Sequence, residues 1–406
     1  MTVHPTSGLT HKAKVGQLGL DLTPLVIGGT LFLGTAGLVL ALGLPQPFLW
    51  IWLSALPLCL LGGIRAKTDF GSKLCLVGFG LALSLGLLEG IFMFNWLTPG
   101  PGYFDGGWLK TKDISSGLSY VVKGGALGYS PRPGVRVVSR KTHGSQLIYD
   151  VVYTISDRGV RVTRGNPNGD TWLFMGCSIM FGEGVNDDET LPTYFSADLG
   201  YQANVVNLAF HGYGPHQMLR SLELDLPRPL IHGVVRKVVY EAIANHAWRA
   251  AGHDSWDLYG PSYSLSREGV TYVGPFHNQL TGLLLEALQK SNFFRIVLDR
   301  TLFRVRVTDE DIERYARILE RSAQLSRKQY GAGFLVVFRG WDNDLSPRVL
   351  QRLRKTNLQI LMVSDVIPRR DWAGLKLPID GHPNPEYHRR LAAALAARLS
   401  AVAQRP

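Results

Sequence analysis

Residues 171–184 read Thr-Trp-Leu-Phe-Met-Gly-Cys-Ser-Ile-Met-Phe-Gly-Glu-Gly, and this stretch sets the architecture of the second half of the chain. The apolar run at 172–176 predicts a short buried strand, and a helical segment follows it. At such a strand-to-helix turn the hydroxyl of Ser178 is exposed beside free backbone N–H groups, which suits a nucleophile. Taken alone the pattern is ambiguous, because a serine that only caps the helix is the commoner case.

The alternation of strand and helix continues from this point to the C-terminus. Further apolar runs predict strands at 205–209, 237–243, 333–338 and 358–363, and helices are expected near 189–199, 215–225, 279–290, 308–328, 346–356 and 385–403. Strands that are buried on both faces and alternate with helices indicate a parallel sheet covered on each side. We therefore expect an α/β domain at 171–406, with functional groups at the carboxyl ends of its strands.

Four signals lie at separate strand ends. Ser178 follows the first strand, and Gly212 follows the second, where a glycine leaves its N–H free to bind an oxyanion. Asn245 follows the third strand and can donate its amide to the same oxyanion. Asp380 and His382 precede the last helix, where an acid can orient an imidazole base. Each signal has a plain structural alternative, but their joint occurrence in this order favours a catalytic site.

In these residues the chain resembles the SGNH (GDSL-type) hydrolase superfamily, and the stretches at 153–161, 184–190 and 212–217 resemble a membrane-anchored bacterial branch of it. Ser178 matches the nucleophile of block I, Gly212 the glycine of block II, Asn245 the asparagine of block III, and Asp380 and His382 match block V. The resemblance implies a three-layer α/β/α sandwich and attack of the serine on an ester carbonyl. It also implies that the histidine is the base, that the aspartate orients it, and that the Ser N–H, the Gly N–H and the Asn side chain form the oxyanion hole.

Three blocks depart from the superfamily's pattern. Cys177 replaces the aspartate of Gly-Asp-Ser, and block III reads Ile-Ala-Asn-His at 243–246. Block V is Asp-x-His, one residue shorter than the usual Asp-x-x-His, so His388 is a second candidate for the base. These departures keep open an alternative function, a non-catalytic membrane-anchored binding or assembly protein with an SGNH-like fold.

The N-terminal quarter is nearly free of charge. Residues 1–97 hold only five basic and three acidic residues, and they contain apolar runs at 25–44, 48–64 and 74–97. These runs are near the length that crosses a bilayer, and they are too long and too numerous for a cleaved signal peptide. We expect three transmembrane helices within 24–97, after a cytoplasmic tail at 1–23, in preference to the alternative of two spans and a re-entrant segment. Glu89 lies inside the third run, where a charge is costly unless it reaches polar partners.

The placement of basic residues predicts the orientation. Lys12 and Lys14 lie in the tail, and Arg65, Lys67 and Lys73 lie around the second loop, whereas the connector at 45–47 has no charge. The tail and the second loop should therefore be cytoplasmic, and everything after residue 97 should lie outside. In a bacterium this means a multi-pass inner-membrane protein with a periplasmic or extracytoplasmic C-terminal domain.

Residues 98–170 are predicted to form a small β-rich appendage. Tyr149, Val151 and Tyr153 alternate at period two, and a turn follows at 156–159.

Composition limits the function classes that remain. The net charge is +11, yet only 18% of residues are charged, which is low for a soluble protein. Three cysteines exclude a disulfide scaffold, no His/Cys cluster has metal-ligand spacing, and no nucleic-acid motif accompanies the basic residues. We expect an envelope-anchored serine ester hydrolase or O-acyl transferase that needs no metal or other cofactor. Its substrate would be an acylated glycan or lipid, and other envelope proteins are conceivable partners.

Overall fold

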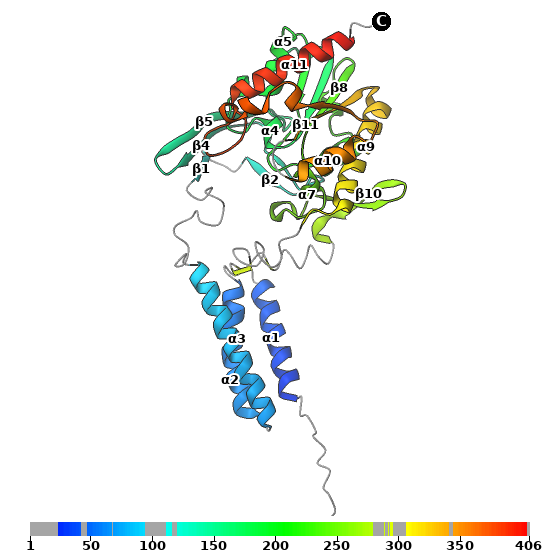
Figure 1. Ribbon diagram of the computed structural model, residues 1–406. Helices are drawn as coiled ribbons and strands as arrows, with labels where there is room; N and C mark the ends of the chain where they lie inside the picture. Colours follow the sequence, from blue (N-terminus) through cyan, green and yellow to red (C-terminus); the bar gives the residue numbers. More distant parts are fainter. Residues whose placement is uncertain are drawn as a thin grey trace, which may run out of the picture. The chain divides into compact units, whose positions relative to one another are not determined.

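A computed structural model describes residues 23–41, 47–66, 68–93, 111–115, 120–278, 306–340 and 344–403, together with Leu288, Ser291, Phe293 and Phe294. The chain divides into two compact units (Figure 1). Unit 1 contains residues 1–96 and 290–293, and unit 2 contains residues 97–289 and 294–406.

Unit 1 is built on three helices, α1 (Thr23–Ala41), α2 (Pro47–Arg65) and α3 (Asp69–Met93). Among the described residues, α2 and the Asp69–Ile91 part of α3 are long and apolar enough to cross a membrane. The first predicted run coincides with α1. Within the described part of α1 only Thr30–Val39 forms an apolar helix, and this stretch is shorter than a candidate span. By length and composition the structure therefore supports two candidate spans, where the sequence predicts three.

The third predicted span differs in its bounds. It begins at residue 69, five residues before the apolar run, because Thr68 caps the helix: its Oγ1 atom accepts a hydrogen bond from the Gly71 N–H at 3.1 Å. Residues 94–97 of this run lie outside the described part of the chain. Within unit 1, the buried Glu89 accepts hydrogen bonds from the Ser291 hydroxyl and, at 3.4 Å, from the Phe293 N–H. Its polar partners are thus residues far downstream, and they satisfy the carboxylate at an otherwise apolar position.

Unit 2 contains a parallel five-stranded sheet, as predicted. Its strands are β6 (Thr171–Met175), β7 (Asn204–Asn207), β8 (Val235–Ile243), β11 (Gly333–Arg339) and β12 (Gln359–Met362), in the order β12-β11-β8-β6-β7. Counted along the chain this order is 2-1-3-4-5, which places the topological switch point between β6 and β8. Ligand sites of such sheets lie at this point, outside the carboxyl ends of the strands.

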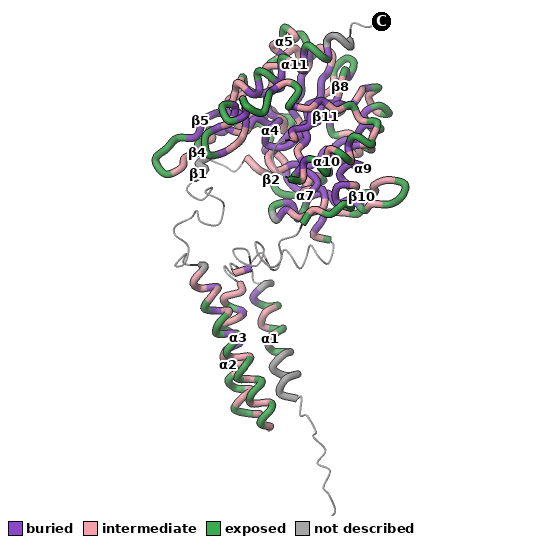
Figure 2. The backbone as a smooth tube through the Cα atoms, in the orientation of Figure 1, coloured by how far each residue is buried: buried purple, intermediate pink, exposed green. Residues whose placement is uncertain are grey.

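Helices cover both faces of this sheet, which makes three layers (Figure 1). One face packs against α5 (Leu191–Asp198) and α11 (Pro385–Ala403). The other packs against α6 (Pro215–Glu223), α7 (His246–Ala250), α9 (Asp309–Tyr330) and α10 (Leu345–Leu353). Successive residues of a strand serve opposite cores, because side chains alternate along it. Trp172 and Phe174 of β6 belong to the first core and Leu173 and Met175 to the second, and Figure 2 shows the central strands as buried.

The β-rich segment forms two small sheets. β4 (Val135–His143) pairs antiparallel with β1 (Thr111–Ser115) and β5 (Gln146–Ile155), and β2 (Val121–Lys123) pairs with β3 (Tyr129–Pro131). Bridges from Arg161 to Ile155 and to Asn207 connect β5 with the edge strand β7. The segment therefore belongs to the same compact unit as the sandwich, and a domain boundary at residue 170 stays a prediction.

Two further elements were not predicted from the sequence. One is the antiparallel hairpin of β9 (Pro261–Ser266) and β10 (Gly269–Pro275), and the other is the short helix α7. Apart from Leu288, the helix expected near 279–290 lies outside the described residues.

Candidate active site

Ser178 lies at the carboxyl end of β6, as predicted. It is the first residue of the one-turn helix α4 (Ser178–Phe181), and it is buried, where the sequence predicts an exposed hydroxyl. Gly182 ends this helix with a φ of +85°, a left-handed conformation that favours glycine. The sharp turn on both sides of α4 fixes the hydroxyl at the switch point of the sheet.

The structure brings Ser178, His382 and Asp380 together. The Nε2 atom of His382 lies 2.9 Å from Ser178 Oγ, and its Nδ1 atom is hydrogen-bonded to Asp380 Oδ1. The backbone N–H of His382 donates to the same carboxylate at 3.1 Å. Gly381, with a φ of +83°, allows this close return of the chain, so the shortened Asp-x-His spacing still pairs the two side chains.

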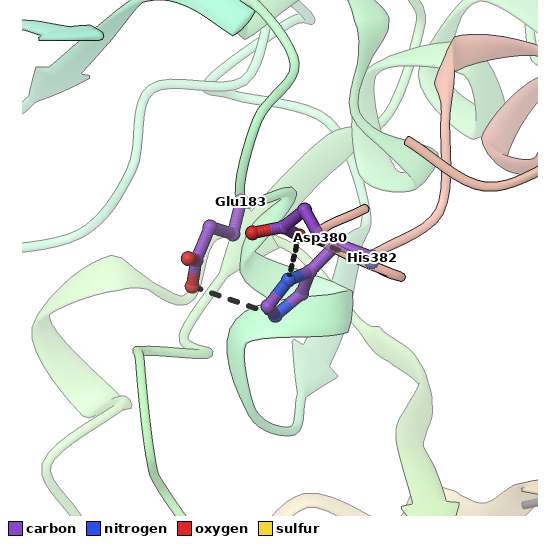
Figure 3. Close-up of side chains that lie close together, drawn as sticks. All are labelled: Glu183, Asp380 and His382. Carbon is purple, nitrogen blue, oxygen red and sulfur yellow. Dashed lines mark hydrogen bonds and ion pairs between the residues drawn. The ribbon is translucent and has the colours of Figure 1, made fainter. Parts of the chain in front are cut away.

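Two more charged residues that sequence reasoning did not single out, Glu183 and Lys141, belong to this cluster, and Figure 3 shows Glu183 beside His382. Glu183 Oε2 lies 3.5 Å from His382 Nε2 and 2.6 Å from His211 Nδ1. Lys141 Nζ lies 2.8 Å from Asp380 Oδ2 and 3.8 Å from Glu183 Oε1, and the side chains of Lys141 and Asp380 are buried. His382 is thus held between two carboxylates, and Lys141 from β4 partly compensates their charge.

This arrangement shifts the pKa values of the cluster. Burial would lower the pKa of His382, but Glu183 and Asp380 outweigh it and the pKa is raised. Burial would raise the pKa of Asp380, but the hydrogen bond from His382 and the ammonium of Lys141 hold it below its usual range. Burial would also raise the pKa of Glu183, but His382, His211 and Lys141 hold this pKa below its usual range. Both carboxylates are therefore ionised around neutral pH and stabilise an imidazolium between them.

No protein-family model matches the chain, and no curated protein matches it. Among solved structures it is similar to a G-D-S-L family protein from Desulfitobacterium hafniense DCB-2, with 11% identity over 57% of this chain and 99% of that one and a TM-score of 0.34. It is also similar to a carbohydrate acetylesterase family member from Sinorhizobium meliloti, with 14% identity over 57% of this chain and 98% of that one and a TM-score of 0.32.

A third similar structure is AlinE4, an SGNH-hydrolase family esterase, with 13% identity over 59% of this chain and 98% of that one and a TM-score of 0.28. The similarity is to SGNH and GDSL hydrolases. At such identities and TM-scores the likeness carries no argument about activity, which has to rest on the geometry of the site.

The glycine and the asparagine of the SGNH pattern lie at the expected strand ends. Gly212 follows β7 with a φ of +71°, and a Cβ there would lie 2.7 Å from both Trp256 Nε1 and Tyr129 Oη, so only glycine fits. Asn245 directly precedes α7, after β8, and its side chain is exposed. Because β6 and β8 are parallel neighbours, Asn245 lies at the same edge of the sheet as Ser178. Donation by either residue to an oxyanion stays a prediction.

The second candidate for the base is placed differently. His388 is on α11 and only 1% exposed, and burial lowers its pKa to about 3. Neither of its ring nitrogens has a hydrogen-bond partner among the described residues. It is a neutral core residue, and the histidine that contacts Ser178 is His382.

Glu183, Asp380 and His382 also deserve a test as metal ligands, since their ligand atoms lie within 4.8 Å of one another. A cation in this place would have to displace Lys141 from Asp380 and break the contact between His382 and Ser178. The donor set therefore fits proton transfer better than metal binding.

Proposed function

We propose that unit 2 is a serine ester hydrolase or O-acyltransferase of the SGNH type. The observation that carries this proposal is the His382 imidazole, which contacts Ser178 Oγ at 2.9 Å through one nitrogen and Asp380 through the other. In this arrangement Ser178 is the nucleophile, His382 is the base, and Asp380 orients the ring and supports its positive charge.

The reaction follows from these contacts. As Ser178 Oγ attacks the ester carbonyl, its proton passes to His382 Nε2, and the oxyanion is bound by the Ser178 N–H, the Gly212 N–H and the Asn245 amide. Collapse of the tetrahedral intermediate expels the alcohol, which takes the proton from His382, and leaves an acyl-serine. Water or a sugar hydroxyl then attacks this acyl group and gives its proton to His382, which returns a proton to Ser178 Oγ as the acyl product leaves.

The proposal extends to the place of the reaction. All three N-terminal helices would anchor the protein in a bacterial inner membrane, and the residues before α1 and the loop between α2 and α3 would be cytoplasmic. The substrate would then be an ester-bearing glycan or lipid outside the cytoplasm. Support comes from the two helices long enough to span and from the basic residues around the second loop.

Turnover of p-nitrophenyl acetate by the purified full-length protein in detergent tests the activity. Ser178→Ala and His382→Ala should each abolish nearly all turnover, because nucleophile and base act as a unit. Asp380→Asn should retain some activity, because it disturbs only the orientation and charge support of the imidazole. Equal activity of Ser178→Ala and the wild type would contradict the proposal, and absence of turnover in the wild type would favour the non-catalytic alternative.

A further inference from the structure

A cavity of about 1200 Å³ opens beside the proposed catalytic residues. Glu183, His211 and Gly212 line it on the catalytic side, and Trp256 and Tyr259 belong to its lining as well. These two rings are 57% and 49% exposed. Scattered single apolar residues are normal on a protein surface, but two large rings on one turn that borders a cavity indicate a binding surface.

The turn that carries these rings is firmly anchored. Asp257, between them, is 1% exposed, and its Oδ2 atom receives hydrogen bonds from His216 Nε2 at 2.6 Å and Gln217 Nε2 at 2.7 Å. The N–H of Gly260 donates to the Asp257 carbonyl at 2.9 Å and closes the turn. Buried polar contacts thus hold the turn in place although its rings face outward. Such preorganisation lowers the cost of binding a ligand.

The aromatic wall begins at the proposed oxyanion hole. A Cβ on Gly212 would meet Trp256 Nε1 and Tyr129 Oη at 2.7 Å each, and the Tyr129 hydroxyl donates to the His211 carbonyl at 2.8 Å. A group that stacks on the Trp256 ring therefore lies next to the glycine whose N–H would bind the oxyanion.

The chemistry of the lining discriminates between the two substrate classes. Beside the rings of Tyr129, Trp256 and Tyr259 it offers Lys123 and the backbone of three glycines, whereas Val121 and Leu258 are its aliphatic members. A fatty acyl chain is best enclosed by aliphatic groups, which remove it from water. A pyranose ring has apolar C–H faces and hydroxyl edges, which match aromatic faces flanked by an indole N–H and an ammonium group.

We propose that this cavity binds the saccharide part of an acylated glycan, with Trp256 as the stacking platform. This inference rests on the proposed esterase function and specifies its substrate class.

Specificity of turnover provides the first test, with full-length protein in detergent and with O-acetylated xylohexaose, p-nitrophenyl acetate and p-nitrophenyl octanoate as substrates. Trp256→Ala should lower the ratio of kcat/KM for acetylated xylohexaose to that for p-nitrophenyl acetate about tenfold, mainly through KM, as expected for loss of an aromatic anchor. Trp256→Phe should restore most of this ratio. Val273→Ala, which removes an exposed apolar side chain on β10 away from the cavity, should leave the ratio unchanged.

Binding separates this inference from the proposed reaction. Isothermal titration calorimetry measures binding of xylohexaose and chitohexaose to the Ser178→Ala protein and does not depend on turnover. We expect at least one hexamer to bind, and Trp256→Ala in the same background to weaken its binding about tenfold. A glycan site is overturned if neither hexamer binds, or if Trp256→Ala leaves binding unchanged. It is also overturned if Trp256→Ala selectively lowers turnover of the octanoate, which would make the cavity an acyl-chain site.

Discussion

At the scale of single residues, the proposed base, His382, has a carboxylate beside each of its ring nitrogens. Asp380 holds Nδ1, while Glu183 lies 3.5 Å from Nε2, the atom that would accept the serine proton. Glu183 also binds His211, whose Nε2 lies 2.7 Å from the Tyr120 hydroxyl. The pKa of His382 is raised, so the base should be protonated over a wider range of acidic pH than an ordinary histidine.

Replacing Glu183 with Gln should shift the pH profile. Activity requires neutral His382, so it is lost as the pH falls through the pKa of this residue. Because Glu183 raises that pKa, Glu183→Gln should move the acid limb of kcat/KM toward lower pH. The profile is measured with p-nitrophenyl acetate, and Glu268→Gln, an exposed carboxylate on the β9–β10 turn, is the control. An acid limb that stays in place or moves upward would show that Glu183 does not act on the base.

Replacing Lys141 with Met should have the opposite effect on the same limb. Lys141 lowers the pKa of His382, so its removal should move the acid limb to higher pH. The variant also leaves the buried Asp380 without its ammonium partner, which should destabilise the protein by about 3 kcal/mol. Thermal unfolding measures this loss, with the exposed Lys355→Met as control. The double variant Lys141→Met/Asp380→Asn should lose less stability than the sum of the two single losses. If its loss equals that sum, the ion pair does not account for the destabilisation.

At the scale of elements, the β-rich segment helps to build the site. Arg161 is fully buried and donates to the carbonyls of Phe181, Gly182 and Val185 at 2.7, 2.6 and 2.7 Å. In β5, the Tyr153 hydroxyl accepts a hydrogen bond from the Gly184 N–H at 2.8 Å. These contacts fix the loop that follows α4 and carries Glu183.

Arg161→Met should therefore affect both stability and activity. It leaves the carbonyl groups of this loop without their buried donor, and the expected loss is about 3–5 kcal/mol, as for other broken buried polar networks. Thermal unfolding measures the loss of stability, and ester turnover of the purified protein measures the loss of activity. Arg164→Met, which changes an exposed arginine three residues further on, is the control. Equal stability and activity of the two variants would contradict a supporting role of Arg161.

The elements also show what the sequence could predict. The five strands were recognisable because burial on both faces makes them continuous apolar runs. Ser178, Asp380 and His382 stood out because each follows or precedes such an element. Lys141 and Glu183 did not, because their partners come from distant segments: β4 reaches the loop before α11 only through tertiary packing. Glu183 lies in the quoted motif, but a single acidic residue after a helix gives no sign of its distance to a histidine.

At the scale of the whole molecule, the division into an apolar helical unit and a polar α/β unit predicts opposite environments for the two. With basic residues in the tail and the second loop, the C-terminus should lie outside the cytoplasm. A reporter enzyme that is active only outside the cytoplasm, fused after Pro406, should be active, and a reporter active only inside should not. The reverse pattern would contradict the orientation and the envelope function together.

Covalent labelling of Ser178 tests the central claim most directly. The full-length protein in detergent is treated with a fluorophosphonate, which reacts with activated serines, and the modified peptide is located by mass spectrometry. We predict one adduct, on Ser178, that is absent from Ser178→Ala and forms much more slowly in His382→Ala. An unlabelled wild-type protein, or an adduct on another serine, would contradict the assignment of Ser178, His382 and Asp380 as the catalytic residues.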